Sequence, residues 1–296
     1  MNNEVHRVLA VTAMLLGVLV LPAPAQERIS NAKLETRSAA QGIEREVRAV
    51  ASRGGVVWIG YSVPMTVASR PSFDNDSYGA CWLGGWGADG NSKTANELVS
   101  RGSRVRLEPP SELLVLARFE NGEIVRVRAF TADCDVDAGG AAVVWFTNVR
   151  PDDSVAWLAT LANSSRATNR TDRVVQSAMS AIAFHQAQAA DRVLVAMARD
   201  DASRRVRGQA LFWLATRASR EALSTITGAI ENDPDTEVKK KAVFALSQMP
   251  KEEGVPRLID VARTNKNVEV RKQAMFWLGQ SNDPRALKFF EEILLK

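Results

Sequence analysis

The chain has 296 residues, of which 46% are hydrophobic and 24% are charged, and its formal net charge is +4. This composition is typical of a globular protein and excludes a predominantly disordered chain. Two His and two Cys are too few for a zinc cage, a haem centre or the histidine-rich site of a di-iron enzyme.

The N-terminus carries the pattern of an export signal. Arg7 precedes an apolar run over residues 8–21, and small residues around Ala25 suit cleavage before Gln26. The run is shorter than the roughly 20 apolar residues that a membrane span needs, and no later stretch is long enough. We therefore expect a signal peptide over residues 1–25 and an exported protein, periplasmic or secreted, that does not span a membrane. An uncleaved N-terminal anchor is the alternative.

Residues 26–150 predict a small α+β domain. Gly54-Gly55 ends an amphipathic helix, and Asn121-Gly122 is a strong hairpin signal between two apolar strands. Residues 151–166, which open with Pro151, predict a helix that caps the region after it. The other predicted elements are a helix over residues 43–50 and strands over residues 56–63, 113–119, 123–130 and 141–147.

Export changes what the two cysteines predict. Cys81 and Cys134 are the only pair in the sequence, and an oxidising compartment favours joining them. We expect a disulfide between them, which closes a loop worth about 4 kcal/mol in the chain-entropy model. Two buried thiols are the alternative.

Three further patterns bear on cofactors and metals. Asp133, Asp135 and Asp137 alternate, so in a strand their carboxylates share one face and are weak candidates for calcium. An EF-hand loop that starts at Asp133 needs Gly and Glu where Ala138 and Val144 stand, so a solvated strand end is the preferred interpretation. Residues 85–90 read G-x-G-x-x-G without the strand and helix of a dinucleotide site. We expect no cofactor.

His185 is the only histidine after the predicted signal peptide. Ser180 lies near it in the sequence, but the spacing singles out no nucleophile for a catalytic triad. We expect His185 to be a turn residue between two helices and predict no catalytic residue.

A 32-residue repeat fills the C-terminal part of the chain. Three copies begin at Val206, Val238 and Val270, and a weaker one begins at Val174. Each copy places apolar residues at i, i+4, i+7 and i+8, which is one face of a helix. A second helix follows in each unit, so residues 167–296 predict an all-α solenoid of about four helical pairs. Its apolar positions are Leu223, Ile226 and Ile230, then Val255, Leu258 and Ala262, then Leu287, Phe290 and Leu294.

Two columns recur at this period. Asn169, Asp201, Asp233 and Asn265 precede the first helices, where short polar side chains stabilise turns. Phe212, Phe244 and Phe276 lie beside the main apolar face, where they can stack against neighbouring units.

The segment from Asp233-Pro234-Asp235 to Leu246 resembles the HEAT repeat pattern, in the short bacterial form called PBS-lyase-like or E-Z type. Asn282-Asp283-Pro284 resembles the linker and second-helix start of that pattern. The resemblance covers about residues 167–296 and implies a solenoid fold. It implies no single activity, because these repeats occur in scaffolds, lyases and hydroxylases. The hydroxylases hold two irons with His-Glu pairs, which this sequence lacks, and export argues against the cytoplasmic bilin lyases.

The positive charge belongs to the repeats. Residues 171–296 carry 20 Lys or Arg against 16 Asp or Glu, whereas residues 26–170 carry 17 of each. Basic residues on the first helices predict a stripe that can bind an acidic surface. A solvated face whose Arg207 column pairs with neighbouring Asp residues is the alternative. The candidate partner-binding residues are Arg204, Arg207, Lys239, Lys240, Arg271 and Lys272.

These observations predict a non-enzymatic binding or scaffolding protein. Its partner would be another protein or an anionic component of the cell envelope rather than nucleic acid. The alternative is an enzyme or a calcium-dependent regulator with its site in the N-terminal domain. The sequence leaves the oligomeric state open.

Overall fold

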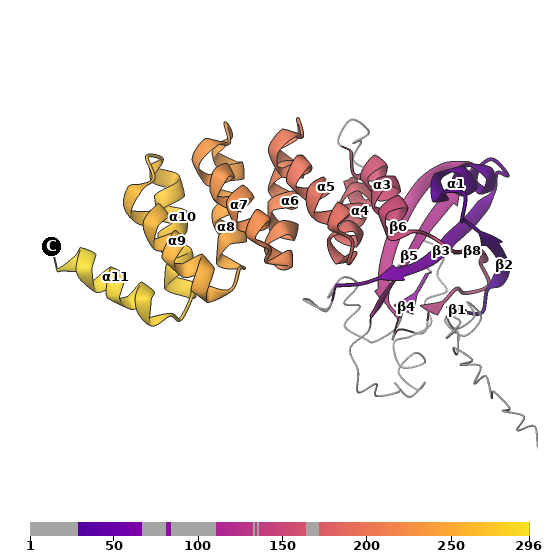
Figure 1. The fold of residues 1–296 in the computed structure, drawn as a ribbon, viewed down its shortest axis with the longest axis horizontal. Coiled ribbons are helices and arrows are strands. Elements are labelled where there is room, and N and C mark those ends of the chain that lie inside the picture. The colour runs from indigo at the N-terminus through magenta and orange to yellow at the C-terminus, as the bar shows by residue number, and fades with distance from the viewer. Residues whose placement is uncertain are drawn as a thin grey trace, which may run out of the picture.

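The structure is a computed structural model that describes residues 29–66, 81–83, 111–132, 134, 136–163 and 172–295. A mixed α/β region comes first and a run of helices follows it (Figure 1). The strands are β1 Ile29–Ser30, β2 Lys33–Ser38, β3 Val56–Pro64, β4 Cys81–Trp82, β5 Glu112–Glu120, β6 Glu123–Thr131, β7 Val136–Asp137 and β8 Ala142–Thr147. The helices are α1 Ile43–Ala51, α3 Pro151–Ala162, α4 Asp172–Phe184, α5 Gln188–Asp200, α6 Arg204–Arg217, α7 Arg220–Asn232, α8 Thr236–Ser247, α9 Lys251–Thr264, α10 Val268–Gln280 and α11 Pro284–Leu294.

The main sheet has five strands in the order β2-β8-β3-β5-β6. Strand β8 lies between β2 and β3 and is parallel to both, whereas β3, β5 and β6 are antiparallel neighbours. The predicted hairpin is confirmed: Asn121 and Gly122 join β5 to β6 with φ values of 51° and 85°. Two consecutive positive φ values are what a two-residue hairpin turn requires.

Both faces of this sheet are covered. Alternate residues of β3 point to opposite sides, so Ile59 and Tyr61 join a core with α1, α3 and α4, while Trp58 packs on the other side. That second side is covered by the three-stranded sheet β1-β7-β4. Strands β3 and β5 are therefore largely apolar along their length, as expected for strands buried on both faces.

Helices α4 to α11 form the solenoid in four successive pairs (Figure 1). The 32-residue register predicts their starts, because short polar residues cap the first helices. Ser203 caps α6, Asp235 caps α8 and Asn267 caps α10, each accepting backbone N–H groups of the first turn. The predicted turn column is confirmed at three of its four positions, since Asp201, Asp233 and Asn265 each accept the amide two residues on. Asn169 lies outside the described residues.

The apolar core is continuous from the sheet into the helices. One cluster of buried residues runs from α1 and the inner face of the sheet through every helical pair to Phe289 of α11. The last strand ends at Thr147 and α3 begins at Pro151, so the strands and the helices on either side of this point share one core. None of the helices in the described residues is long and apolar enough to cross a membrane.

Candidate functional site

Contacts between successive repeats define the surface of the solenoid. Arg207 of α6 extends to the turn before α8. There it donates two hydrogen bonds to the Asp233 carboxylate, Nε to Oδ2 at 2.8 Å and Nη2 to Oδ1 at 3.1 Å. Its Nη1 donates to the backbone oxygens of Asp201 and Ala202. The hydrogen bonds to Asp233 raise the pKa of the Arg207 guanidinium above its usual value. This side chain therefore fixes one repeat on the next.

The structure corrects the place of Arg207 in the predicted basic stripe. Arg207 is only 9% exposed and Asp233 is equally buried, so this cation is not available on the surface. A buried guanidinium is stable only when it is paired, and the Asp233 carboxylate is the partner of Arg207. The alternative interpretation, a column tied to neighbouring Asp residues, describes Arg207 correctly.

The other five predicted cations are also engaged. Arg204 pairs with Asp235 of the next repeat. Lys240 pairs with Glu237 and Lys272 pairs with Glu269, at equivalent positions of α8 and α10. Lys239 donates to the backbone oxygen of Glu231, and Arg271 donates to those of Asn265 and Lys266. Intramolecular partners therefore weaken the positive field of the stripe, and its binding role stays a proposal.

An aromatic column runs beside these cations. Phe212 and Phe244 stack with centroids 5.9 Å apart and planes 2° apart, which confirms the predicted stacking between units. Phe244 continues onto Trp277 at 4.9 Å, and Trp277 contacts Phe276. Phe276 itself is 54% exposed, so the column ends at the surface.

The last helix differs from the equivalent helices before it. The register predicts Leu287 and Leu294 on a buried face, because the equivalent Ile230, Val255 and Ala262 are buried. In α11, however, Leu287 is 62% exposed and Leu294 is 82% exposed, so that expectation is wrong. Each earlier second helix packs on the next first helix, α5 on α6, α7 on α8 and α9 on α10.

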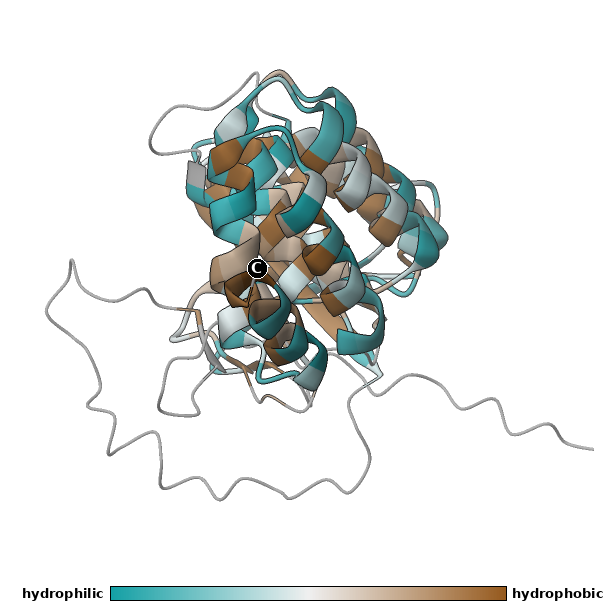
Figure 2. Cartoon of the chain, turned by 90° about the vertical axis from the view of Figure 1, so that its left-hand side faces the viewer, coloured by the Kyte–Doolittle hydropathy of each residue, from teal (hydrophilic) through white to brown (hydrophobic). Residues whose placement is uncertain are grey.

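Helix α11 has no such neighbour among the described residues, and it lies at the outer end of the stack (Figure 1). Figure 2 looks at this end and shows hydrophobic turns of α11 beside the C-terminus. We call Phe276, Leu287 and Leu294 the C-terminal face.

The opposite end of the solenoid meets the sheet through a buried polar relay that the sequence did not predict. Tyr61 of β3 lies 2.8 Å from Ser154 of α3, whose Oγ lies 2.8 Å from Nε2 of His185. Nδ1 of His185 lies 2.7 Å from the backbone oxygen of Ala181, which can only accept. Nδ1 therefore carries the proton, Nε2 accepts from Ser154, and Ser154 accepts from Tyr61.

Burial determines the protonation of this relay. Burial, together with the nearby Arg217 guanidinium, lowers the pKa of His185 to about 4. Burial also raises the pKa of the Tyr61 hydroxyl. His185 is a turn residue, as predicted. Its side-chain partner is Ser154. The nearby Ser180 hydroxyl donates instead to the backbone oxygen of Ser177 in its own helix. The three side chains are fully buried, so they join the sheet to α3 and α4 and are not positioned to act on a substrate.

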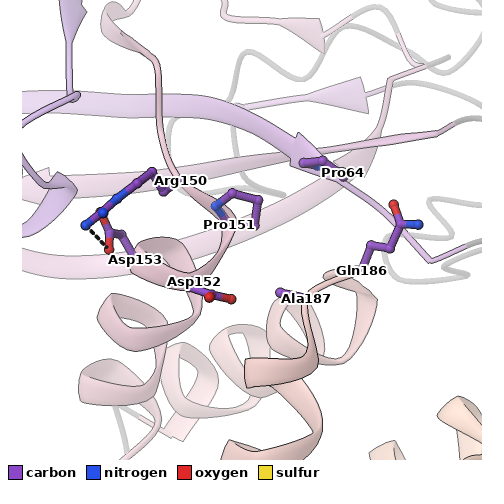
Figure 3. A pocket seen from close by; sticks show the side chains of 7 residues that line it. All are labelled: Pro64, Arg150, Pro151, Asp152, Asp153, Gln186 and Ala187. Atoms are coloured by element: carbon purple, nitrogen blue, oxygen red, sulfur yellow. Dashed lines mark hydrogen bonds and ion pairs between the residues drawn. The ribbon is translucent and has the colours of Figure 1, made fainter.

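An open pocket of about 550 Å³ lies between the end of β3, the start of α3 and the turn after α4 (Figure 3). Pro64 and Gln186 line one side and the start of α3 lines the other, where Arg150 forms an ion pair with Asp153. Ser154 follows the lining residue Asp153 in the chain, and His185 precedes the lining residue Gln186. Both side chains are buried in the core and do not line the pocket. The pocket thus has charged walls, formed by Arg150, Asp152 and Asp153.

The candidate metal residues are only partly described. Asp133 and Asp135 lie outside the described residues. Asp137 is buried, and its carboxylate accepts hydrogen bonds from the Asn31 side chain and the Gly139 amide. Asp137 therefore has a structural role in closing the turn before β8. No cluster of three potential ligands occurs in the part of the chain that the structure describes.

Cys81 lies in the small sheet, and Cys134 lies just before its strand β7. Cys81 opens β4 and pairs with Val136 of β7, two residues beyond Cys134. This backbone register brings the two chain segments together, but the side chain of Cys81 lies outside the described residues, so the disulfide stays a prediction. Residues 1–25 and the glycine-rich residues 85–90 also lie outside the described residues.

Comparison with known families agrees with the helical architecture. Residues 191–266 and residues 223–296 match the family described as HEAT repeats. The protein is thus an α-solenoid protein with HEAT repeats over residues 191–296, preceded by a mixed α/β region. No curated protein matches the chain.

Proposed function

We propose that this protein is an exported, non-enzymatic scaffold that binds a partner protein through its solenoid. HEAT repeats form helical scaffolds suited to protein interaction. The observation that carries the proposal is the C-terminal face, where Leu287 and Leu294 are exposed although Val255 and Ala262, at the same positions of the preceding repeat, are buried. Exposed apolar clusters on a folded protein mark interaction sites.

Export rests on the sequence. The apolar run before Ala25 is a signal-peptide pattern, and we propose the periplasm or the extracellular space as the location. The partner is then a protein of the cell envelope, or an anionic envelope component that engages the exposed Arg204 and Lys272. A disulfide between Cys81 and Cys134 suits the same location. Thiol alkylation of the purified protein before and after reduction counts the bond directly.

Crosslinking tests the binding role. The mature chain, residues 26–296, is incubated with an envelope extract, crosslinked and analysed by mass spectrometry. We expect crosslinks that map to residues 191–296 and that Leu287→Glu removes, while Glu221→Gln, a surface change on α7, leaves them in place. An extract that yields no crosslink to the solenoid contradicts the proposal.

The calcium-dependent alternative makes a different prediction. An ion that binds the folded state and not the unfolded state stabilises the protein, so in this alternative EDTA would lower the melting temperature. We expect an unchanged melting temperature, because Asp137 is already satisfied by Asn31 and Gly139. A stoichiometric metal in the purified protein would restore the alternative.

A further inference from the structure

The last helical pair of the solenoid has an arginine, Arg271, whose hydrogen bonds to the described residues all come from one nitrogen, Nη1. Arg271 is the equivalent of Arg207, 64 residues later in the same register. Its Nη1 donates to the backbone oxygens six and five residues before it, as Nη1 of Arg207 does. In Arg207, Nε and Nη2 donate to the carboxylate of Asp233, 26 residues later. For Arg271, no hydrogen bond or ion pair joins Nε or Nη2 to any of the described residues.

The guanidinium of Arg271 is therefore held in the orientation of Arg207 with the edge that would bind a carboxylate left free. Two backbone carbonyls fix one nitrogen, so little side-chain entropy remains to be lost when a carboxylate binds. A planar guanidinium binds a carboxylate through two parallel hydrogen bonds, which is the strongest geometry available to such a pair. Arg271 is thus prepared for an acidic side chain.

The apolar residues at this end also occupy positions that form contacts between repeats earlier in the solenoid. Phe276 occupies the position at which Phe212 stacks on the next repeat, and Leu287 occupies the position of the buried Val255. The apolar part of the interface between repeats therefore continues to a surface that no described element covers, and Arg271 adds the guanidinium that Arg207 uses at the interface with Asp233.

A second copy of this chain does not fit that surface. Head-to-tail stacking needs a free N-terminal end of the solenoid, but α3 and α4 are packed on the sheet there. The Asp283 carboxylate at this end is buried and held by Arg285. Asp283, the carboxylate in the turn before α11, is therefore not available to the Arg271 of a second copy.

We propose that the C-terminal face and Arg271 together form a docking site for a helix pair of another protein, one that carries a carboxylate in the turn before its first helix. The inference rests on the proposed scaffolding function and names its contact surface. The partner extends the stack as a further repeat would, with its carboxylate on Nε and Nη2 of Arg271 and its apolar residues on Phe276 and Leu287.

A peptide copied from the protein itself provides the probe. Residues 233–264 contain the turn, α8 and α9, and within the chain Asp233 of this unit occupies the fork of Arg207. The full chain is titrated with this peptide and with its Asp233→Asn form. We expect the Asp peptide to bind about tenfold more tightly, the difference that one charge-assisted pair supplies. Arg271→Gln should abolish the preference, whereas Lys272→Gln, which removes a neighbouring charge, should keep it.

A second form of the experiment covers a peptide that stays unfolded alone. The same unit is joined directly after Lys296, which places its Asp 26 residues after Arg271. Urea denaturation of the four combinations of Arg271 or Gln with Asp or Asn then measures the coupling, and we expect about a tenfold effect on the unfolding equilibrium.

The proposal is overturned if neither assay shows an Arg271-dependent preference for Asp. It is equally overturned if sedimentation shows a dimer of the chain that Leu287→Glu dissociates. Neither result would remove crosslinks between a partner and other parts of residues 191–296. The broader scaffolding function is therefore contradicted only if the crosslinking experiment yields no crosslink to the solenoid.

Discussion

The two ends of the solenoid differ in what covers them. At the N-terminal end, α3 and α4 pack on the sheet, and Tyr61, Ser154 and His185 are fully buried between them. At the C-terminal end, Leu287 is exposed, and among the described residues Arg271 donates hydrogen bonds only to backbone oxygens. The same repeat chemistry builds both ends, so availability for binding depends on the neighbour of a repeat rather than on its own sequence.

The largest expected effect comes from breaking an internal contact between repeats. Asp233→Ala leaves the Arg207 guanidinium buried without its carboxylate, and we expect the free energy of unfolding to fall by about 4 kcal/mol. Urea denaturation followed by circular dichroism measures the loss. Asp260→Ala, which removes an exposed carboxylate of α9, should change stability by less than about 0.5 kcal/mol. Equal losses in the two variants would contradict the importance of the buried pair.

Acid should loosen the covered end. The pKa of His185 lies at about 4 in the folded protein, below the roughly 6.5 of an unfolded histidine. The unfolded chain therefore binds this proton first as the pH falls, so stability is complete above about pH 6.5 and is lost progressively toward pH 4, by up to about 3 kcal/mol. Denaturation between pH 7 and pH 4.5 measures the loss, and His185→Gln should flatten this part of the profile. An identical profile in the variant would show that other groups cause the acid sensitivity.

The middle of the polar relay gives a smaller effect. Ser154→Ala leaves both the Tyr61 hydroxyl and Nε2 of His185 without their partner, and we expect a loss of about 2 kcal/mol. Ser180→Ala provides the matched control, because its hydroxyl bonds only within α4. Thermal unfolding of both variants tests the difference, and the account fails if Ser180→Ala is the more destabilised.

The smallest effect belongs to the open end. Arg271→Ala removes hydrogen bonds to two backbone oxygens but no ion pair with a described residue, so we expect a loss below about 1 kcal/mol. The same urea experiment as for Asp233→Ala gives the comparison. A loss as large as that of Asp233→Ala would mean that Arg271 already has a strong partner within the chain.

Periodicity predicted the solenoid because each repeat carries its own local signals. The Val206, Val238 and Val270 copies mark the first helices, and Asp283-Pro284 marks the start of α11. The burial of Arg207 was foreseeable in part, since the Arg and Asp columns share one period. Their contact across 26 residues follows only from how the repeats stack.

The rest could not be read from local patterns. Tyr61 and Ser154 are 93 positions apart and Ser154 and His185 are 31 apart, so no local spacing connects them. Leu287 has the same periodic position as Val255, and periodicity cannot tell whether a neighbouring helix covers a face.

Amide hydrogen exchange of the full chain tests the contrast between the two ends most directly. Exchange in a covered element requires extensive unfolding, whereas an element packed on one side opens locally. The account predicts the slowest exchange in α3 and α4 and the fastest in α10 and α11, with a gradient between them. Protection of α11 equal to that of α4 would contradict an open C-terminal end and, with it, the docking site proposed there.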